Sequence, residues 1–315
     1  MTTHLGPPAG ALAPSDRARE LVRGAFDLHV HVSPDVVERR ITDVGLARRF
    51  AELGLAGFVL KSHYTSTAER AAVVREAVPG VEALGAIALN RAVGGMNALA
   101  VEIAAREGAR VVWLPTVDAT SEAHHRERLP AGAKPPVWMR LQDELRELGI
   151  ENEPVAVVDS RGDVLPETRA VLAAIARHGL VLATGHLGRE ETLAVVDAAV
   201  AAGVREIVAT HPDYPAQSLT VADQVELAGR GALVERCFTT PHTGKVPWEL
   251  WLLATREVGP DRCVLATDLG QVSNPPVEDG LALLADRLLG AGFREEEVRT
   301  MAVANTRRVA GAPAQ

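Results

Sequence analysis

Segments that would cross or address a membrane are absent from this sequence. It contains no run of about 18 consecutive apolar residues, the length that a membrane-spanning helix needs. The stretch Met1–Asp16 lacks an apolar segment flanked by positive charge, which is the pattern of a secretory signal. We therefore expect a soluble protein that resides in the cytoplasm and does not associate with a membrane.

Cysteine, aromatic residues and clustered positive charge are also scarce. The two cysteines, Cys237 and Cys263, are too few for a disulfide framework and lack the spacing of a zinc knuckle. We expect them to be buried free thiols in a reducing compartment. Aromatic residues make up 3% of the chain, the formal net charge is −8, and no basic block contains interleaved aromatics. These features argue against nucleic-acid binding.

The chain does contain enough apolar sequence to build a large core. Hydrophobic residues make up 47% and charged residues 23% of its 315 residues, which excludes an intrinsically disordered chain. Its three lysines, Lys61, Lys134 and Lys245, are greatly outnumbered by arginines. Each lysine can therefore be considered individually as a functional candidate.

Short β-type runs alternate with longer segments of helical period over most of the chain. Several of the helical segments end at a glycine, as helices commonly do. The predicted strands are 26–30, 57–61, 82–88, 110–115, 180–184, 206–210, 232–235 and 263–267. The predicted helices are 41–53, 67–78, 96–107, 136–148, 167–178, 190–202, 221–229, 247–258 and 277–289.

This alternation predicts an α/β protein whose parallel strands are covered by helices. Eight repeats fit a (β/α)8 barrel of the TIM type, which takes about 250 residues plus insertions. We expect a loose N-terminal arm over residues 1–22 and a single barrel domain over residues 23–315. Two insertions are expected, a long loop at 116–135 and a small β-hairpin at 155–164. If residues 155–158 formed a ninth strand instead, an open doubly wound sheet would be favoured.

Two histidines end the first predicted strand in the sequence His29-Val30-His31. Because side chains alternate along a strand, both imidazoles point to the same side. Two imidazoles on one side of a strand form a platform that can bind a metal ion through both rings. Two buried histidines with polar partners and no metal would give the same local sequence.

Three further residues of metal-ligand type end predicted strands five, six and eight: His186, His211 and Asp268. In a parallel barrel, the carboxyl ends of the strands meet at one rim, where functional side chains lie. Buried His and Asp side chains without partners are costly, so their convergence indicates mutual pairing or a bound cation. Together with His29 and His31, these residues predict a metal site.

The order of these motifs resembles that of the amidohydrolase superfamily of metal-dependent hydrolases. The resemblance covers the predicted barrel and implies a (β/α)8 fold with one or two divalent ions, often zinc, that activate a water. It also implies that His29, His31 and Asp268 ligate the first metal, with Asp268 taking the proton of the attacking water. His186 and His211 would complete that site or hold a second metal.

The fourth predicted strand departs from the pattern of this superfamily. Many members with two metals carry a carboxylated Lys or a Glu at its end, and Val111–Thr116 offers neither. A single metal ion is therefore our first choice. The nearest substitute is Lys61, at the end of strand two, which either bridges two metals in carboxylated form or binds a substrate carboxylate or phosphate as an ammonium. His63 shares that strand end and is a further substrate-binding candidate.

Other side chains on the same predicted rim are also candidates for the site. Glu235, at the end of strand seven, is a candidate acceptor for a ligand imidazole. Arg91 follows strand three, and His242 and Lys245 lie in a loop after strand seven, so we assign these three to substrate binding. The basic residues among them, together with Lys61, indicate an anionic substrate.

These candidates predict an enzyme, a metal-dependent hydrolase that cleaves an amide, lactam, imide or lactone bond in a small, polar, anionic molecule. A zinc or other divalent ion would activate the water, Asp268 would accept its proton, and His211 or the metal would polarise the scissile bond. The alternatives are a non-hydrolytic decarboxylase, a phosphoester hydrolase and a catalytically silent metal- or ligand-binding barrel. The expected partner is a small-molecule substrate, and residues 1–22 and the predicted hairpin are candidate contacts in a homo-oligomer.

Overall fold

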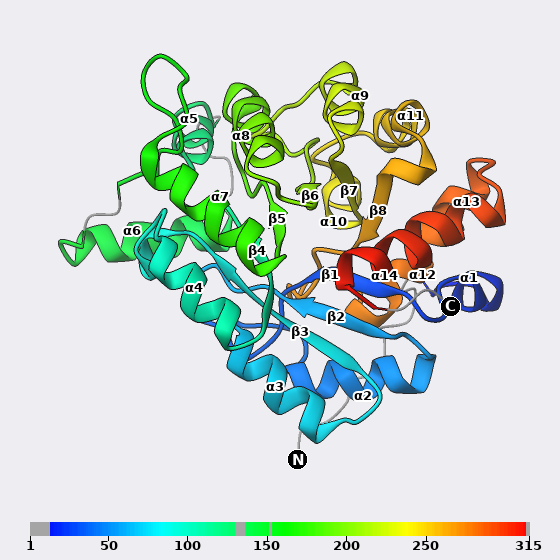
Figure 1. Cartoon of the computed structure of the whole chain (residues 1–315). Helices are drawn as coiled ribbons and strands as arrows, with labels where there is room; N and C mark the ends of the chain where they lie inside the picture. Colours follow the sequence, from blue (N-terminus) through cyan, green and yellow to red (C-terminus); the bar gives the residue numbers. More distant parts are fainter. Residues whose placement is uncertain (1–12, 130–135, 151–152, 313–315) are drawn as a thin grey trace.

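A computed structural model describes residues 13–129, 136–150 and 153–312 of the chain. Eight parallel strands follow one another in chain order in one sheet (Figure 1). Their bounds are β1 Phe26–Val30, β2 Gly57–Leu60, β3 Glu82–Ala88, β4 Ala109–Trp113, β5 Val181–Ala183, β6 Glu206–Ala209, β7 Leu233–Cys237 and β8 Cys263–Ala266. All eight predicted strands are confirmed, with small differences at their ends.

The sheet curls until its last strand returns to its first. Beyond the end of β8, the amide of Asp268 donates to the carbonyl of His29 at 2.9 Å. At the same seam, the carboxylate of Asp27 accepts hydrogen bonds from the hydroxyl of Thr267 at 2.6 Å and from its amide at 3.0 Å. These contacts join the two edges of the sheet, and the predicted TIM-type barrel is confirmed.

Helices alternate with the strands and surround the barrel (Figure 1). Those that correspond to predicted helices are α2 Asp43–Leu53, α3 Ala68–Ala77, α4 Ala98–Arg106, α6 Val137–Glu147, α7 Pro166–His178, α8 Arg189–Ala201, α9 Val221–Gly229, α11 Trp248–Val258 and α12 Val277–Gly290. The short elements besides these are α1 Asp16–Leu21, η1 Arg91–Val93, α5 Thr120–Glu127, α10 Thr239–His242, η2 Pro260–Arg262, α13 Glu295–Arg299, the π-helical turn η3 Thr300–Ala304 and α14 Asn305–Ala310.

Both faces of the barrel strands are buried, which explains why the sequences of the strands are largely apolar runs. One set of strand residues fills the barrel interior, including Phe26, Val59 and Trp113. The alternate set packs outward under the helices, where Phe58 and Val112 are buried. The polar residues that follow the strands are therefore left at the rim, where the barrel core ends.

Helix α14, which was not predicted from the sequence, closes the amino end of the barrel. Val309 and Ala310 belong to the interior cluster. The amide of Phe26 donates to the hydroxyl of Thr306 at 3.3 Å, and Arg110 Nε donates to the carbonyl of Val309 at 2.9 Å. The start of β1 and the start of β4 are thus tied to the same helix.

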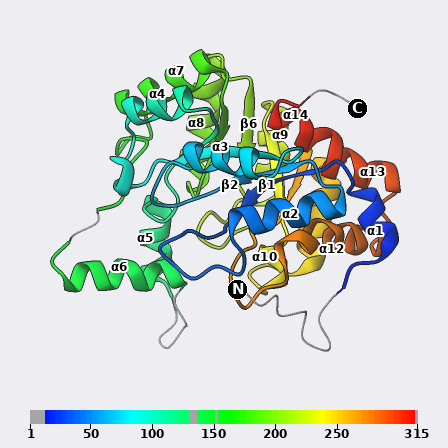
Figure 2. The ribbon, with the colours of Figure 1, turned by 90° about the horizontal axis from the view of Figure 1, so that it is seen from below.

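The segment after β4 differs from the prediction of a long loop, because it contains helix α5. Helix α6 follows and lies at the edge of the molecule in both views (Figures 1 and 2). It is tied to the end of β4 by Gln142, whose Nε2 donates to the carbonyl of Val117 at 3.0 Å and to Asp118 Oδ1 at 2.8 Å. Residues 130–135 of the predicted loop lie outside the described part of the chain.

The predicted hairpin is present as a tight turn closed by one antiparallel bridge. Val158 pairs with Val164, and the amide of Asp159 donates to the carbonyl of Asp163 at 2.9 Å. Gly162 allows the turn because its φ of 86° lies in the left-handed region. This segment therefore adds no ninth strand to the sheet.

The described part of the N-terminal arm packs against the barrel helices. Ser15 accepts a hydrogen bond from the amide of Ala18, which caps α1, and its hydroxyl donates to Asp286 of α12 at 2.6 Å. The first twelve residues of the predicted arm lie outside the described part. Within 13–129, 136–150 and 153–312, no helix combines the length and apolar character needed to span a membrane.

Candidate metal centre

Three of the predicted metal ligands lie together at the seam between β1 and β8. His29 Nε2 is 3.2 Å and His31 Nε2 is 3.1 Å from Asp268 Oδ1. The ligand atoms of the three residues all lie within 4.8 Å of one another. His29 on β1 and His31 directly after it point to the same side, and the main-chain hydrogen bond from Asp268 to His29 holds the carboxylate opposite them. The site thus follows directly from the closure of the barrel.

Three more imidazoles border this group. The ring centroid of His211 lies 5.6 Å from that of His29 and 4.9 Å from that of His186. His63 lies 5.0 Å from His31 and 6.3 Å from His186, measured in the same way. The rim therefore carries five neighbouring imidazoles. The described chain has two tight groups of ligand-type residues, His29 with His31 and Asp268, and His29 with Glu235 and Cys237, and neither includes His186 or His211.

Two of the predicted ligands adopt backbone conformations that residues other than glycine rarely take. The φ angles are 52° for Asp268 and 21° for His211, and such conformations typically cost about 1–3 kcal/mol. Gly270 makes the sharp turn after β8 possible, because a Cβ at this position would lie 1.6 Å from the carbonyl oxygen of His31. Backbone strain is thus concentrated at the candidate site.

Two buried carboxylates orient the rings of His29 and His186. His29 Nδ1 lies 3.2 Å from Glu235 Oε1, and His186 Nδ1 lies 2.6 Å from Glu122 Oε1. A carboxylate accepts the Nδ1 proton and leaves Nε2 as the atom available to a metal. Glu235 therefore has the acceptor position that the sequence predicted, whereas Glu122, on α5, is an addition.

An amide orients the third ring. Gln217 Nε2 donates to two main-chain carbonyls at 2.8 and 2.7 Å, which fixes the direction of its side-chain amide. Gln217 Oε1 consequently faces His211 Nδ1, at 3.0 Å. His211 then carries its proton on Nδ1, and its Nε2 keeps a free lone pair. This tautomer suits a metal ligand better than it suits a hydrogen-bond donor to substrate.

Burial favours the neutral form of three imidazoles at the rim. Burial and the positive charge of Arg39 hold the pKa of His31 well below its usual value, and burial and Lys61 do the same for His186. Burial, with the neighbouring His186, lowers the pKa of His211 to about 3. Neutral imidazoles are the form that binds metal ions. These rings are therefore ready to act as ligands at neutral pH.

Lys61 lies at the centre of the site rather than on the surface. Its Nζ is 2.9 Å from His29 Nε2 and 5.1 Å from the ring centre of Trp113. Burial lowers the pKa of Lys61, whereas Glu235 and Asp268 outweigh burial and raise the pKa of His29. At this distance, the two nitrogens can share one proton but cannot both be fully charged.

The donor set fits a divalent transition metal ion. Two imidazole nitrogens and one carboxylate oxygen are the ligand types that zinc prefers, and further imidazoles lie beside them. Although burial alone would raise the pKa of Asp268, contact with His29 and His31 keeps it well below its usual value, so the carboxylate is ionised. His29 Nε2 can join the set only when Lys61 turns away from it.

A cavity of about 630 Å³ opens onto these residues. Its lining includes His31, Lys61, His63, His186, His211, Lys245 and Asp268, all of which the sequence assigned to the site. Lys245 reaches it from the loop after β7, donates to the hydroxyl of Tyr214 and lies 4.1 Å from the centre of that ring. The cavity thus joins the candidate metal ligands to most of the predicted substrate-binding residues.

Two predicted substrate-binding residues are not among the described residues that line this cavity. Arg91 donates from Nε to the carbonyl of Glu153 at 2.8 Å and from Nη2 to that of Pro154 at 2.9 Å. His242 stacks on Phe238, with ring centroids 4.7 Å apart. Both side chains therefore have structural contacts outside the cavity.

Some residues of the site were not found by sequence reasoning. Glu122 lies on a helix in a segment expected to be a loop, and Gln217 follows β6 at a distance that no motif marks. Arg39 lines the cavity from the loop after β1, and in the sequence it differs in no visible way from Arg40. The only sequence feature that could have indicated a role for Arg39 is that this charged loop directly follows the two histidines.

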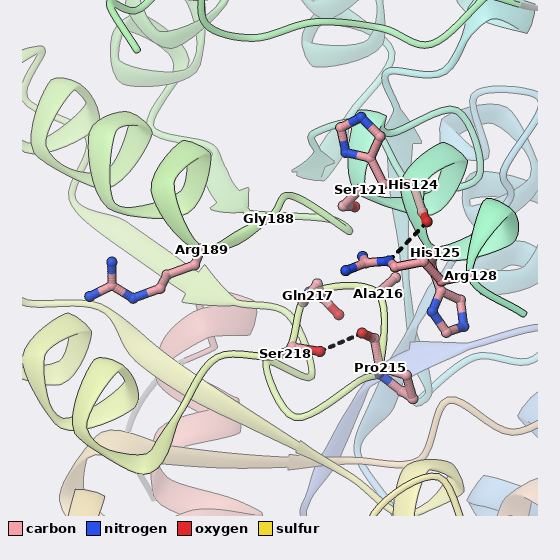
Figure 3. Close-up of a pocket in the computed structure, with 10 residues that line it drawn as sticks. All are labelled: Ser121, His124, His125, Arg128, Gly188, Arg189, Pro215, Ala216, Gln217 and Ser218. Carbon is pink, nitrogen blue, oxygen red and sulfur yellow. Dashed lines mark hydrogen bonds between the residues drawn. The ribbon is translucent and has the colours of Figure 1, made fainter. Parts of the chain in front are cut away.

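A second pocket, of about 490 Å³, lies outside the predicted site between α5 and the loop after β6 (Figure 3). Arg128 extends into it toward Gln217, and its Nε donates to the carbonyl of His124 at 3.1 Å. Arg189 points away from it (Figure 3). None of the predicted metal ligands lines this pocket, so the larger cavity is the candidate active site.

Comparison with known proteins gives a family for the chain. A family model described as a family of unknown function (DUF6282) matches residues 24–235. The chain belongs to this family. The matched region of this DUF6282 member contains four of the predicted ligands and ends before Asp268. No curated protein matches the chain.

Solved structures with the same fold come from the amidohydrolase superfamily. An amidohydrolase from Pseudomonas aeruginosa has a TM-score of 0.60 at 14% identity, and the match covers 95% of this chain and 100% of the other. The probable dipeptidase PvdM from the same organism has a TM-score of 0.60 at 11% identity, with 94% and 97% covered. The phosphotriesterase homology protein from Escherichia coli has a TM-score of 0.53 at 14% identity, with 90% and 98% covered. The predicted resemblance is thus confirmed at the level of the fold.

Proposed function

We propose that this chain is a metal-dependent hydrolase that cleaves an amide, lactam, imide or lactone bond in a small anionic molecule. The observation that carries the proposal is the group His29, His31 and Asp268 at the carboxyl ends of β1 and β8, of which His31 and Asp268 line a cavity of about 630 Å³. In a parallel barrel, this rim is where catalytic residues lie. The related fold of solved amidohydrolases supports the same reading.

The proposal assigns a separate task to each group in the site. A bound divalent ion, zinc by preference, would supply the Lewis acidity that activates a water. Asp268 accepts the proton, because its carboxylate is ionised and partly open to the cavity, with a side chain 15% exposed. His211 acts as a ligand rather than as a donor, because its proton is tied to Gln217.

The number of metal ions depends on Lys61. As an amine or ammonium, its Nζ lies 2.9 Å from His29 Nε2, and only its carboxylated form could bridge two ions. We therefore propose one ion per chain, measured by elemental analysis of protein purified without chelator. A ratio of about two ions would instead support Lys61 as a carboxylated bridge.

Two variants at the ligand group test the function. His29→Ala and Asp268→Asn should abolish hydrolysis of a panel of lactones, lactams and small amides, and His29→Ala should also lose the metal. His178→Ala is the matched control, because His178 lies on α7 and pairs with Glu102 outside the site. Wild-type protein that binds no metal, or a His29→Ala variant with full activity, would refute the proposal.

The products separate the proposal from its alternatives. Release of carbon dioxide from a panel of small carboxylic acids would identify a decarboxylase, and release of phosphate from phosphoesters would identify a phosphoester hydrolase. A cytoplasmic location is also proposed, because Cys237 and Cys263 are both buried free thiols.

A further inference from the structure

We propose that the substrate carries a free carboxylate and that Arg39 binds it, an inference that rests on the proposed hydrolase and deepens it. Arg39 lies in the loop after β1 and lines the central cavity. It would take the substrate-binding role predicted for Arg91, whose guanidinium is held by the main-chain carbonyls of Glu153 and Pro154.

Arg39 is fixed in position by both its side chain and its backbone. Its Nε donates to Asp35 Oδ2 at 2.7 Å, and the two side chains are only 7% and 3% exposed. Its backbone pairs with that of Gln271 in the loop after β8. A buried guanidinium held in this way loses little conformational entropy when it binds a ligand.

Part of the guanidinium remains available to a ligand. Nη2 has a long contact of 3.5 Å to His31 Nδ1, and no residue in the described chain accepts a hydrogen bond from Nη1. The hydroxyl of Tyr64 is also buried and has no hydrogen-bond partner among the described residues. Tyr64 lines the same cavity as Arg39. A guanidinium edge and an unpaired hydroxyl on the lining of one cavity both supply donors that suit the acceptor oxygens of a carboxylate.

The charges that line the cavity favour binding of an anion, and the charges directly around Arg39 favour a group with a single negative charge. The cavity lining has four cationic side chains and two carboxylates; the cations are Arg39, Lys61, Arg140 and Lys245, and the carboxylates are Glu38 and Asp268. Around Arg39 itself, Asp35 already balances one positive charge. A monoanionic carboxylate fits this surrounding better than a phosphate dianion does.

The position of Arg39 also limits the size of the substrate. His31 contacts Arg39 through Nδ1 and Asp268 through Nε2, so one imidazole ring separates the guanidinium from the proposed base. The carboxylate and the scissile bond must therefore lie only a few bonds apart. The substrate class that fits is a small lactone, lactam or amide with a carboxylate near the reacting carbonyl.

Binding of a simple dicarboxylate tests the inference without requiring catalysis. Glutarate and inorganic phosphate would each be titrated into the purified protein, with its metal, by isothermal titration calorimetry. Arg39→Met should weaken glutarate binding by about 10-fold or more, the usual effect of losing a charged hydrogen-bonding partner. Because this variant leaves Asp35 buried without its partner, the Asp35→Asn, Arg39→Met pair should be measured too, and the same loss is expected. Arg161→Met is the control, because the Arg161 side chain is 80% exposed and does not line the cavity, and it should change binding less than twofold or so.

Hydrolysis separates this inference from the proposed function. A γ-lactone with a ring carboxylate would be compared with its methyl ester, and wild-type protein should prefer the acid, with the preference lost in both Arg39→Met variants. Arg39-dependent glutarate binding without hydrolysis of any panel compound would leave the carboxylate site standing and refute the hydrolase. Equal turnover of acid and ester, glutarate binding that does not depend on Arg39, or tighter binding of phosphate than of glutarate would overturn the inference.

Discussion

Replacing Arg236 by Met should destabilise the protein by about 3–5 kcal/mol, the usual cost of leaving a buried charge without its partner. Arg236 is fully buried on the outward face of β7. Its Nη1 donates to Asp213 at 2.9 Å, and its Nη2 donates to Gln224 at 2.7 Å. Methionine fills much of the same volume, so the loss comes from the uncompensated carboxylate of Asp213, whose side chain is 6% exposed.

The free energy of unfolding would be measured by urea denaturation of four proteins. These are the wild type, Arg236→Met, Asp213→Asn and the double variant. The double variant should recover a large part of the loss, because it removes both charges together. Arg230→Met removes a partly exposed arginine from two surface ion pairs, with Asp197 and Glu226, and should cost less than about 1 kcal/mol. If Arg236→Met costs no more than Arg230→Met, the reasoning from burial is wrong.

Other perturbations test the site and its supports. Glu122→Gln should weaken metal binding by about 10–100-fold, because His186 loses its carboxylate partner. Competition with a metal-binding dye would measure the affinity. An unchanged affinity would contradict the role of Glu122. Gly270→Ala should lower the melting temperature and the metal content together, since its Cβ would lie 1.6 Å from a main-chain oxygen. Adding chelator to the metal-loaded protein should lower the melting temperature, because an ion at 100 times its Kd contributes about 2.7 kcal/mol; equal melting curves would argue against a bound ion.

The stability of the fold should also depend on the charge of Asp223. Burial opposes ionisation of Asp223, but its hydrogen bonds with Thr220 and its ion pair with Arg189 prevail, and its pKa is lowered in the folded protein. A lowered pKa stabilises the fold above the unfolded value of 3.8, and this contribution is lost as the pH falls through the folded pKa. The stability difference between wild type and Asp223→Asn should therefore be present at pH 7 and shrink below pH 3.8; a difference that grows in acid would contradict this.

The barrel was predictable because its strands are buried on both faces and its helices end at recognisable positions. The runs around Phe58 and Val112 are apolar on both sides, so each strand stands out from the helices that flank it. Helices α5 and α14 were not predicted, because their sequences lack this kind of pattern. Thr120–Glu127 is mostly polar, and Asn305–Ala310 is only six residues long, so neither has an apolar period that local sequence can reveal.

The candidate ligands were predictable because they follow strands, whose ends the fold brings to one rim. Arg91 also follows a strand, but the η1 turn carries its side chain toward the carbonyls of Glu153 and Pro154. Arg39 reaches the cavity from a loop whose path depends on pairing with the chain after β8. Positions set by strand register could thus be inferred, whereas positions set by loop path could not.

The closure of the barrel by α14 has a consequence for biosynthesis. Val309 and Ala310 seal the end at which β1 begins, so β1 can be covered only after α14, about 280 residues later in the chain, has been made. Until then, the nascent barrel exposes apolar interior surface at its open end. We therefore expect the newly made chain to need protection of this surface, by a chaperone or by fast docking of α14, more than its final compact form would indicate.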